Sequence, residues 1–247
     1  MIFSREALFD PFFGRLSLFE KKMNYEGWLS HCLKTEPHTL YNMGYVLNFI
    51  KNSDHAGKVL GIGIDPIKET ILIQESKFDQ IDVYDIDAEA VEAGNRYWEN
   101  TSNNVRYYCK NILHDEINLN YDTALFFQMD YIFSDVELSL IIKKFKQSRI
   151  SDCYVITPSL FNINLNKPTS PDIFIYDVFN IFFYLFKSLK LTIKPKTNLR
   201  SDQSTLVTYK RTKNHLTKLF TEQNITIIAQ KSIINSNGSF NLFHFKL

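Results

Sequence analysis

The sequence of 247 residues has almost no excess charge, with 28 lysines and arginines against 27 aspartates and glutamates. A chain so balanced has no field that would draw it toward nucleic acid or an anionic membrane. Its apolar N-terminal stretch is interrupted by Arg5, Asp10 and Arg15, so we expect neither a cleavable signal nor a membrane span. These absences predict a cytoplasmic protein that acts on a small molecule, without nucleic acid and without stable membrane insertion.

Cysteine is also scarce. Cys32, Cys109 and Cys153 are far apart and odd in number, and no two of them have the CxxC spacing of a zinc site. The six histidines show no HxxxH or related spacing. We therefore expect reduced thiols, no disulfide framework and no metal.

What the chain does have, from residue 57 onward, is a regular alternation of short β-rich runs with helical patterns. This order is typical of an α/β fold with a parallel sheet and crossover helices. Two apolar runs around Asn237 and Gly238 predict a closing antiparallel hairpin. Strands are expected at 58–63, 80–85, 105–109, 123–128 and 152–158, and helices at 66–76, 88–100, 134–148 and 210–223.

Two segments fall outside this alternation. Residues 1–56 read as a helical N-terminal cover, clearest at 24–34 and 38–52. Residues 159–200 read as an insertion into the 57–247 α/β domain, where they would form a cap on the acceptor side. Within it, the aromatic stretch 171–190 is apolar almost all round, which indicates a buried helix or a homodimer face.

The first strand leads into an incomplete glycine loop, "GKVLGIGIDPIKET" at 57–70. Gly61 and Gly63 let a ligand approach the main chain, and a strand that turns into a helix leaves amides free. A dinucleotide loop needs a third glycine, but Asp65 and Pro66 stand there, and Pro66 has no amide to donate. The loop therefore weighs against a pyrophosphate.

Asp85 ends the second predicted strand, about 20 residues after the glycines, where a carboxylate can accept both hydroxyls of a ribose. In a parallel sheet, this places the carboxylate at the same edge as Gly61 and Gly63. A nucleoside without phosphate fits best. Asp87 is instead interpreted as the cap of the following helix.

At this point the chain resembles S-adenosylmethionine (SAM)-dependent transferases of the class I methyltransferase fold, from about residue 57 to 157. "VYDIDAEAVEAG" resembles the acidic motif of that family, which implies Asp85 on the ribose and Ile86 against the adenine. "YYCKNIL" places Asn111 where an aspartate usually meets the adenine amine, and "FFQMDY" places Gln128 at the methionine end. The resemblance implies a Rossmann-like fold and SAM as the donor.

A narrower resemblance links "GIGIDPIKETIL" and "YDID" to nicotianamine synthases and related opine-metallophore enzymes. It adds Pro66 to the cofactor loop and implies transfer of the 3-amino-3-carboxypropyl group to a small-molecule acceptor. Methyl transfer and cyclisation of SAM remain alternatives, and a non-catalytic binding protein is a further one.

Candidate residues for the acceptor side are chosen only by their place in the sequence. Asp130, Tyr131 and Tyr176 are the candidates for an acid, a base or an orienting group. Aromatic residues of the N-terminal cover, Tyr25 among them, would form either a lid over a sulfonium or ordinary core.

Overall fold

The computed structural model describes much of the chain, from Leu8 to Leu247, with gaps. The described residues are 8–12, 25–35, 43–44, 46–50, 57–75, 78–102, 104–117, 120–127, 129–158, 206–211, 213–235 and 238–247. Gln128, Tyr176, the whole predicted cap 159–200 and the aromatic stretch 171–190 lie outside them.

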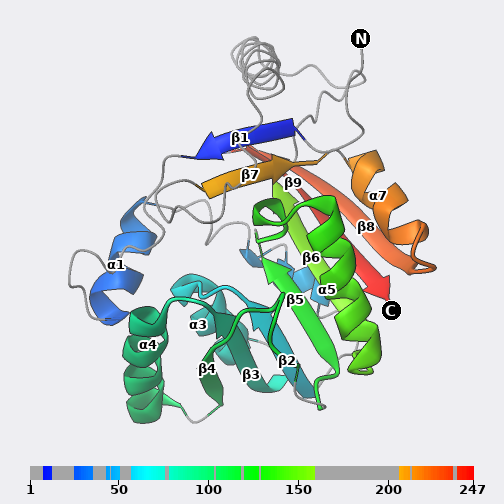
Figure 1. Ribbon diagram of the computed structural model, residues 1–247. Coiled ribbons are helices and arrows are strands. Elements are labelled where there is room, and N and C mark those ends of the chain that lie inside the picture. The colour runs from blue at the N-terminus through cyan, green and yellow to red at the C-terminus, as the bar shows by residue number, and fades with distance from the viewer. Residues whose placement is uncertain are drawn as a thin grey trace.

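The centre of the molecule is a seven-stranded sheet in the order β4-β3-β2-β5-β6-β9-β8 (Figure 1). The first five of these strands are parallel, and β9 runs antiparallel to both β6 and β8. Their bounds are β2 Gly57–Ile62, β3 Phe78–Asp85, β4 Val105–Cys109, β5 Thr123–Phe127, β6 Asp152–Pro158, β8 Thr226–Asn235 and β9 Gly238–Lys246. This is the predicted α/β fold: a mostly parallel, Rossmann-like sheet with a C-terminal antiparallel hairpin.

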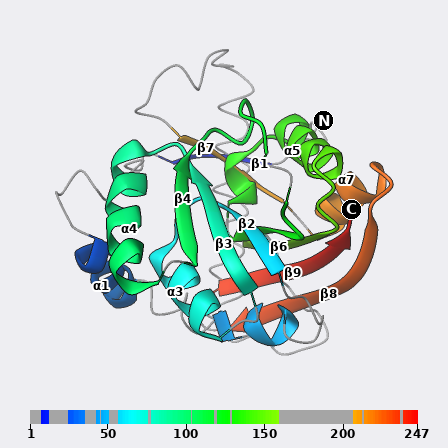
Figure 2. The same cartoon turned by 90° about the horizontal axis from the view of Figure 1, so that it is seen from below.

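Helices cover both faces of the sheet (Figure 2). One face carries α1 Tyr25–Thr35, residues 43–44 and 46–50, α3 Pro66–Glu75 and α4 Ala88–Thr101, which share one buried apolar cluster with the strands. The other face carries α5 Asp135–Gln147 and α7 Lys213–Thr221, which share a second cluster. Because both faces are covered, the central strands are apolar on both sides, as in the fully buried pattern of β5.

A second, two-stranded sheet was not predicted. β1 Leu8–Phe12 pairs antiparallel with β7 Leu206–Lys210, and Figure 1 shows this pair above the end of the main sheet. The expectation of a helical cover is therefore incomplete: it holds for α1 and for the described parts of 43–50, but residues 8–12 form a strand.

The helix α4 packs on the sheet through Ala90, Val91, Gly94 and Trp98, and the partly buried Tyr97 lies against the same cluster. A Cβ at Gly94 would lie 2.0 Å from the ring of Tyr107 on β4, so glycine allows the helix to approach that ring.

The outer edge of β4 is partly covered by α4. The carboxamide of Asn95 donates to the Tyr107 carbonyl (2.9 Å) and accepts from the Tyr107 amide (2.8 Å). One side chain thus satisfies two backbone groups that a neighbouring strand would otherwise bond.

Candidate functional site

The candidate site lies at the carboxyl ends of β2, β3 and β4, beside β5. The order of the strands reverses between β2 and β5, since the chain first adds β3 and β4 on one side and then β5 and β6 on the other. Ligands of open α/β sheets bind at such a switch point. The turn at 63–65, which joins β2 to α3, stands there.

The backbone amides of this turn are already bonded within the protein, contrary to the expectation that they would be free. Each has an acceptor on the chain itself. The bonds run from Gly63 N to the Tyr84 carbonyl (2.9 Å), from Ile64 N to Asp85 Oδ2 (2.9 Å), from Asp65 N to Glu69 Oε2 (3.0 Å), and from Ile67 N and Lys68 N to Asp65 Oδ1 (3.1 Å each). A phosphate would find no amide from 63 to 68 to bind, so the geometry weighs against a pyrophosphate.

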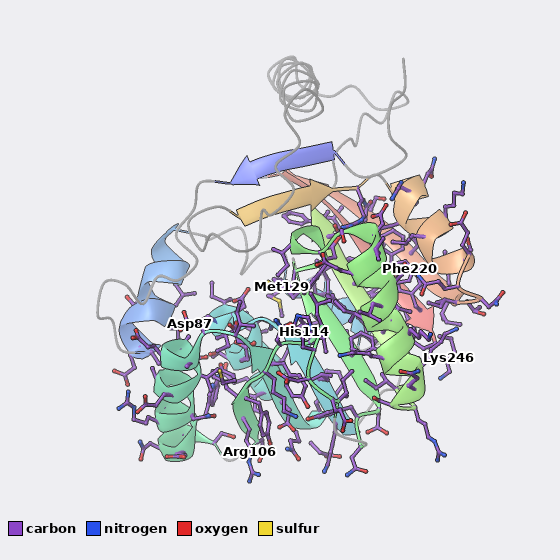
Figure 3. The ribbon with its side chains drawn as sticks, viewed as in Figure 1. Asp87, Arg106, His114, Met129, Phe220 and Lys246 are labelled. Atoms are coloured by element: carbon purple, nitrogen blue, oxygen red, sulfur yellow. The ribbon has the colours of Figure 1, made fainter. Side chains whose placement is uncertain are left out.

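Gly63 is required by its conformation and by its neighbour. Its φ is +78°, in the region that favours glycine. A Cβ there would lie 2.5 Å from Cε of Met129, which follows β5, so the thioether packs directly over the turn. Figure 3 shows Met129 at the edge of the sheet where Asp87 also lies. Gly61 lies inside β2, against Val83 of β3.

Asp85, at the end of β3, has one carboxylate oxygen bonded to the turn and the other to the next helix. Oδ2 accepts from Ile64 N and Oδ1 accepts from Asp87 N, both at 2.9 Å. A carboxylate has about four acceptor positions, so two remain for hydroxyl donors such as those of a ribose. The side chain is only half-buried, which leaves it reachable from solvent.

Of the two residues after Asp85, Asp87 has a structural role and Ile86 is exposed to solvent. Asp87 is the N-cap of α4 and accepts from the amides of Glu89 and Ala90. Ile86 is 65% exposed, an uncommon state for a large apolar side chain beside a candidate site. An aromatic base lying against it would remove that apolar surface from water.

Asn111 follows β4 at the same edge. Its Oδ1 accepts from Leu113 N at 3.0 Å, and its backbone N–H donates to the Asp115 carboxylate. One lone pair of the carboxamide oxygen therefore belongs to a local turn, and the second could accept from an amine.

Pro66 has a local explanation, which its place at the start of the predicted helix 66–76 already allowed. Asp65 caps α3 through Oδ1, and Pro66 occupies the first helical position, where a missing amide leaves nothing unpaired. The absence of a third glycine thus follows from the start of the helix, and it indicates nothing about the path of a ligand.

A buried polar network lies beneath the turn, and sequence reasoning missed it. Lys68 donates from Nζ to the Gly63 carbonyl (2.7 Å) and pairs with Glu69 (3.1 Å), and both side chains are almost fully buried. Burial raises the pKa of Glu69 to about 8, although the Lys68 ammonium lowers it. In the sequence, "KE" in the first turn of a helix resembles an ordinary solvated pair.

The network continues into α4 and α1. The Tyr107 hydroxyl donates to Glu69 Oε2 (3.3 Å), and it also contacts the Tyr25 hydroxyl (2.6 Å) and Trp98 Nε1 (2.9 Å). Tyr25 is 2% exposed and stacks on Tyr97, so it is a core residue and forms no lid.

The predicted acceptor-side residues are only partly described. Asp130 lies in the short 3-10 helix η2, Asp130–Ile132, after β5, and it is fully buried. The backbone of Tyr131 lies in the same turn, while its side chain is outside the description, as are Gln128 and Tyr176. Their roles stay predictions.

The η2 turn is held by Arg211, which follows β7 and is distant in sequence. Its guanidinium donates to the carbonyls of Asp130 (2.8 Å) and Phe133 (2.5 Å) and to the Asp135 carboxylate (2.7 Å), which also contacts His215. The two-stranded sheet is thereby fixed to the edge where the candidate site lies.

Other chemistry is sparse in the described part of the chain. A pocket between α4 and β4, lined by Asn95, Arg106 and Tyr108 among others, contains none of the predicted cofactor residues. Within those residues, no group of three His, Cys, Asp or Glu side chains could hold a metal ion. Across the same residues, every helix is too short or too polar to cross a membrane.

No protein-family model matches the chain, and no curated protein matches it. Solved structures do. A SAM-dependent methyltransferase from Leishmania major is 13% identical, with a TM-score of 0.59 over 88% of this chain and 77% of that one. Magnesium protoporphyrin IX methyltransferase from Synechocystis, with bound SAH, is 12% identical, with a TM-score of 0.56 over 84% and 82%. The N-methyltransferase NodS from Bradyrhizobium japonicum is 11% identical, with a TM-score of 0.52 over 87% and 98%.

These structures define the class: the fold is that of the class I SAM-dependent methyltransferases, as the sequence predicted. At 11–13% identity, the likeness concerns the fold alone.

Proposed function

We propose that the chain binds SAM at the carboxyl edge of β2, β3 and β4 and transfers its methyl group to a small molecule. The observation that carries the proposal is the grouping of Gly63, half-buried Asp85 and exposed Ile86 around a turn without a spare amide. This group suits a nucleoside without phosphate. Methyltransferases of the same fold, one of them with bound SAH, support the choice of donor.

The charge of the edge supports a cationic donor. Asp65 and Asp85 lie there, and the nearby ammonium groups have partners in the protein: Lys68 bonds the Gly63 carbonyl and Glu69, and Lys110 bonds Tyr84 and the Glu116 carbonyl. A sulfonium would gain from such carboxylates, whereas a phosphate would be repelled.

Two observations favour transfer of the methyl group over transfer of the aminocarboxypropyl group. Pro66 was the reason to prefer the aminocarboxypropyl group, and its place as the first residue of α3 now accounts for it. The solved structures similar in fold are named methyltransferases, and none of those named above is an aminocarboxypropyl transferase. Transfer of the aminocarboxypropyl group is the second candidate, with the narrower sequence resemblance in its favour.

Calorimetric titration with SAH tests the donor site. We expect the wild-type protein to bind and Asp85→Ala to lose about ten- to hundredfold in affinity, because hydrogen bonds to a carboxylate contribute about 1.5–3 kcal/mol. Asp87→Ser is the matched control, since it removes a carboxylate from the same edge but keeps a helix cap. If the wild type does not bind SAH, the proposed donor site is wrong, and the alternative of a non-catalytic protein with this fold takes its place.

Analysis of the reaction products tests which group of SAM is transferred. Incubation with SAM and cell extract should yield SAH, detected by mass spectrometry, if a methyl group is transferred. Methylthioadenosine in its place would reverse the choice in favour of the aminocarboxypropyl group. Asp85→Ala protein in the same extract controls for enzymes of the extract.

The acceptor side is part of the proposal. We place the acceptor beside the η2 turn, on the side that faces the proposed donor site, with Asp130 and Tyr131 as the nearest candidates to orient it. Tyr176, the cap 159–200 and a homodimer through 171–190 belong to the same proposal and await mutagenesis and a measurement of mass in solution.

A further inference from the structure

The buried network beneath the turn forms a continuous path from α1 to the candidate donor site. Tyr25 of α1 contacts the Tyr107 hydroxyl, which donates to Glu69, which accepts from the amide of Asp65 in the turn. Each of these side chains except Asp65 is almost fully buried, so water does not compete for the bonds.

The end of this path is the part of the turn that a ligand would meet. Gly63 is held through its carbonyl by Lys68, in a left-handed conformation, and Ile64 is held through its amide by Asp85. The same Asp85 carboxylate is the proposed partner of the ribose. The position of Asp65, fixed by Glu69, therefore affects how Asp85 is presented.

We propose that Glu69 and Tyr25 are positioning residues for the donor site, and that docking of α1 onto α3 and α4 is energetically coupled to donor binding. The inference rests on the proposed function for the identity of the donor. Neither residue touches the donor; both act through the turn at 63–65.

The coupling has a consequence in each direction. If α1 improves the affinity for the donor, then the donor must stabilise the docked α1 by the same factor. Groups facing Glu69 come from every element around it, namely Lys68 and Asp65 from α3 and its turn, Tyr25 from α1 and Tyr107 from β4.

Tyr25→Phe tests the path, because it removes the hydroxyl and keeps the ring that stacks on Tyr97. We expect SAH affinity to fall about two- to tenfold, the range for one buried neutral hydrogen bond. Glu69→Leu should weaken binding more, and Glu69→Gln less, since the amide oxygen of glutamine can still accept from Asp65 N. Hydrogen exchange should slow in α1 when SAH binds to the wild type.

Tyr121→Phe is the matched control. Tyr121 donates to the buried Asp82 at 2.7 Å on the other face of the sheet, so the variant loses a buried tyrosine hydroxyl bond, here to a carboxylate, away from the turn. SAH affinity unchanged in Tyr25→Phe, or reduced equally in Tyr121→Phe, would overturn the inference.

The ligand-free protein separates this inference from the proposed function. If the wild type binds no SAH, the proposed donor is wrong. The physical link is still decided by hydrogen exchange without ligand: faster exchange of the 63–65 amides in Tyr25→Phe than in Tyr121→Phe supports it, and equal exchange refutes it.

Discussion

Glu69 differs from what its place in the sequence suggests. It stands in the first turn of a helix, where an acid is usually solvated, yet it is fully buried between α1, α3 and β4. Burial raises its pKa from 4.5 to about 8. The folded protein therefore holds a proton that the unfolded chain releases across this interval.

This proton gives a testable pH dependence. Because the folded state binds more protons than the unfolded state between about pH 4.5 and 8, the contribution of Glu69 to stability falls as the pH rises through that window. Glu69→Gln is always neutral and lacks this contribution. We expect the unfolding free energy of the wild type, relative to Glu69→Gln, to decrease between pH 5 and pH 8 in urea denaturation. A difference that stays constant would mean that Glu69 is ionised throughout.

Single residues show where sequence reasoning succeeds and where it stops. Asp85 could be placed because the end of a parallel strand fixes a side chain at a known edge. The expectation of free amides around Gly63 was wrong. Three of the acceptors that bind these amides, on Tyr84, Asp85 and Glu69, belong to residues outside the turn. No local pattern announces such partners.

At the scale of the element, α5 is the clearest case of a helix specified by its own sequence. Ser134 caps it, its hydroxyl accepting from Glu137 N while the Glu137 carboxylate accepts from Ser134 N, a reciprocal capping box. Lys144 and Lys146 lie in its last turn, where cations are favourable. The helix predicted at 134–148 agrees with the observed bounds within one residue at each end.

Ser134→Ala should lower the free energy of unfolding by about 1 kcal/mol through loss of this cap. The affinity for SAH should stay unchanged, because α5 begins after the η2 turn and does not contribute to the turn at 63–65. Urea denaturation and calorimetry check the two expectations. Ser148→Ala, at the other end of the helix, is the control, since its bonds come from its backbone.

The small sheet of β1 and β7 shows what element-level patterns miss. Its strands are about 200 residues apart in sequence, and each is only five residues long. Such a pairing depends on tertiary placement, which here includes the anchoring of Arg211 on the η2 turn. A local reading of either segment finds no partner for it.

At the scale of the whole molecule, the order of the elements sufficed to predict the main sheet. Alternating strands and helices with right-handed crossovers admit few arrangements, and the hairpin of β8 and β9 completes one edge of the sheet. The order of the elements does not predict which group of SAM is transferred. The sequence-based choice of the aminocarboxypropyl group depended on a chemical reading of Pro66, which the structure shows at the start of a helix.

The carboxamide of Asn95 has a consequence for how copies of this protein behave toward each other. β4 is an outermost strand, and an uncovered strand edge is a template on which a second chain can add. Asn95→Ala should expose the backbone of Tyr107 and increase self-association on gentle heating, measured by light scattering. Asn100→Ala, which removes only a bond within α4, should not. A single side chain would then protect the solubility of the whole sheet.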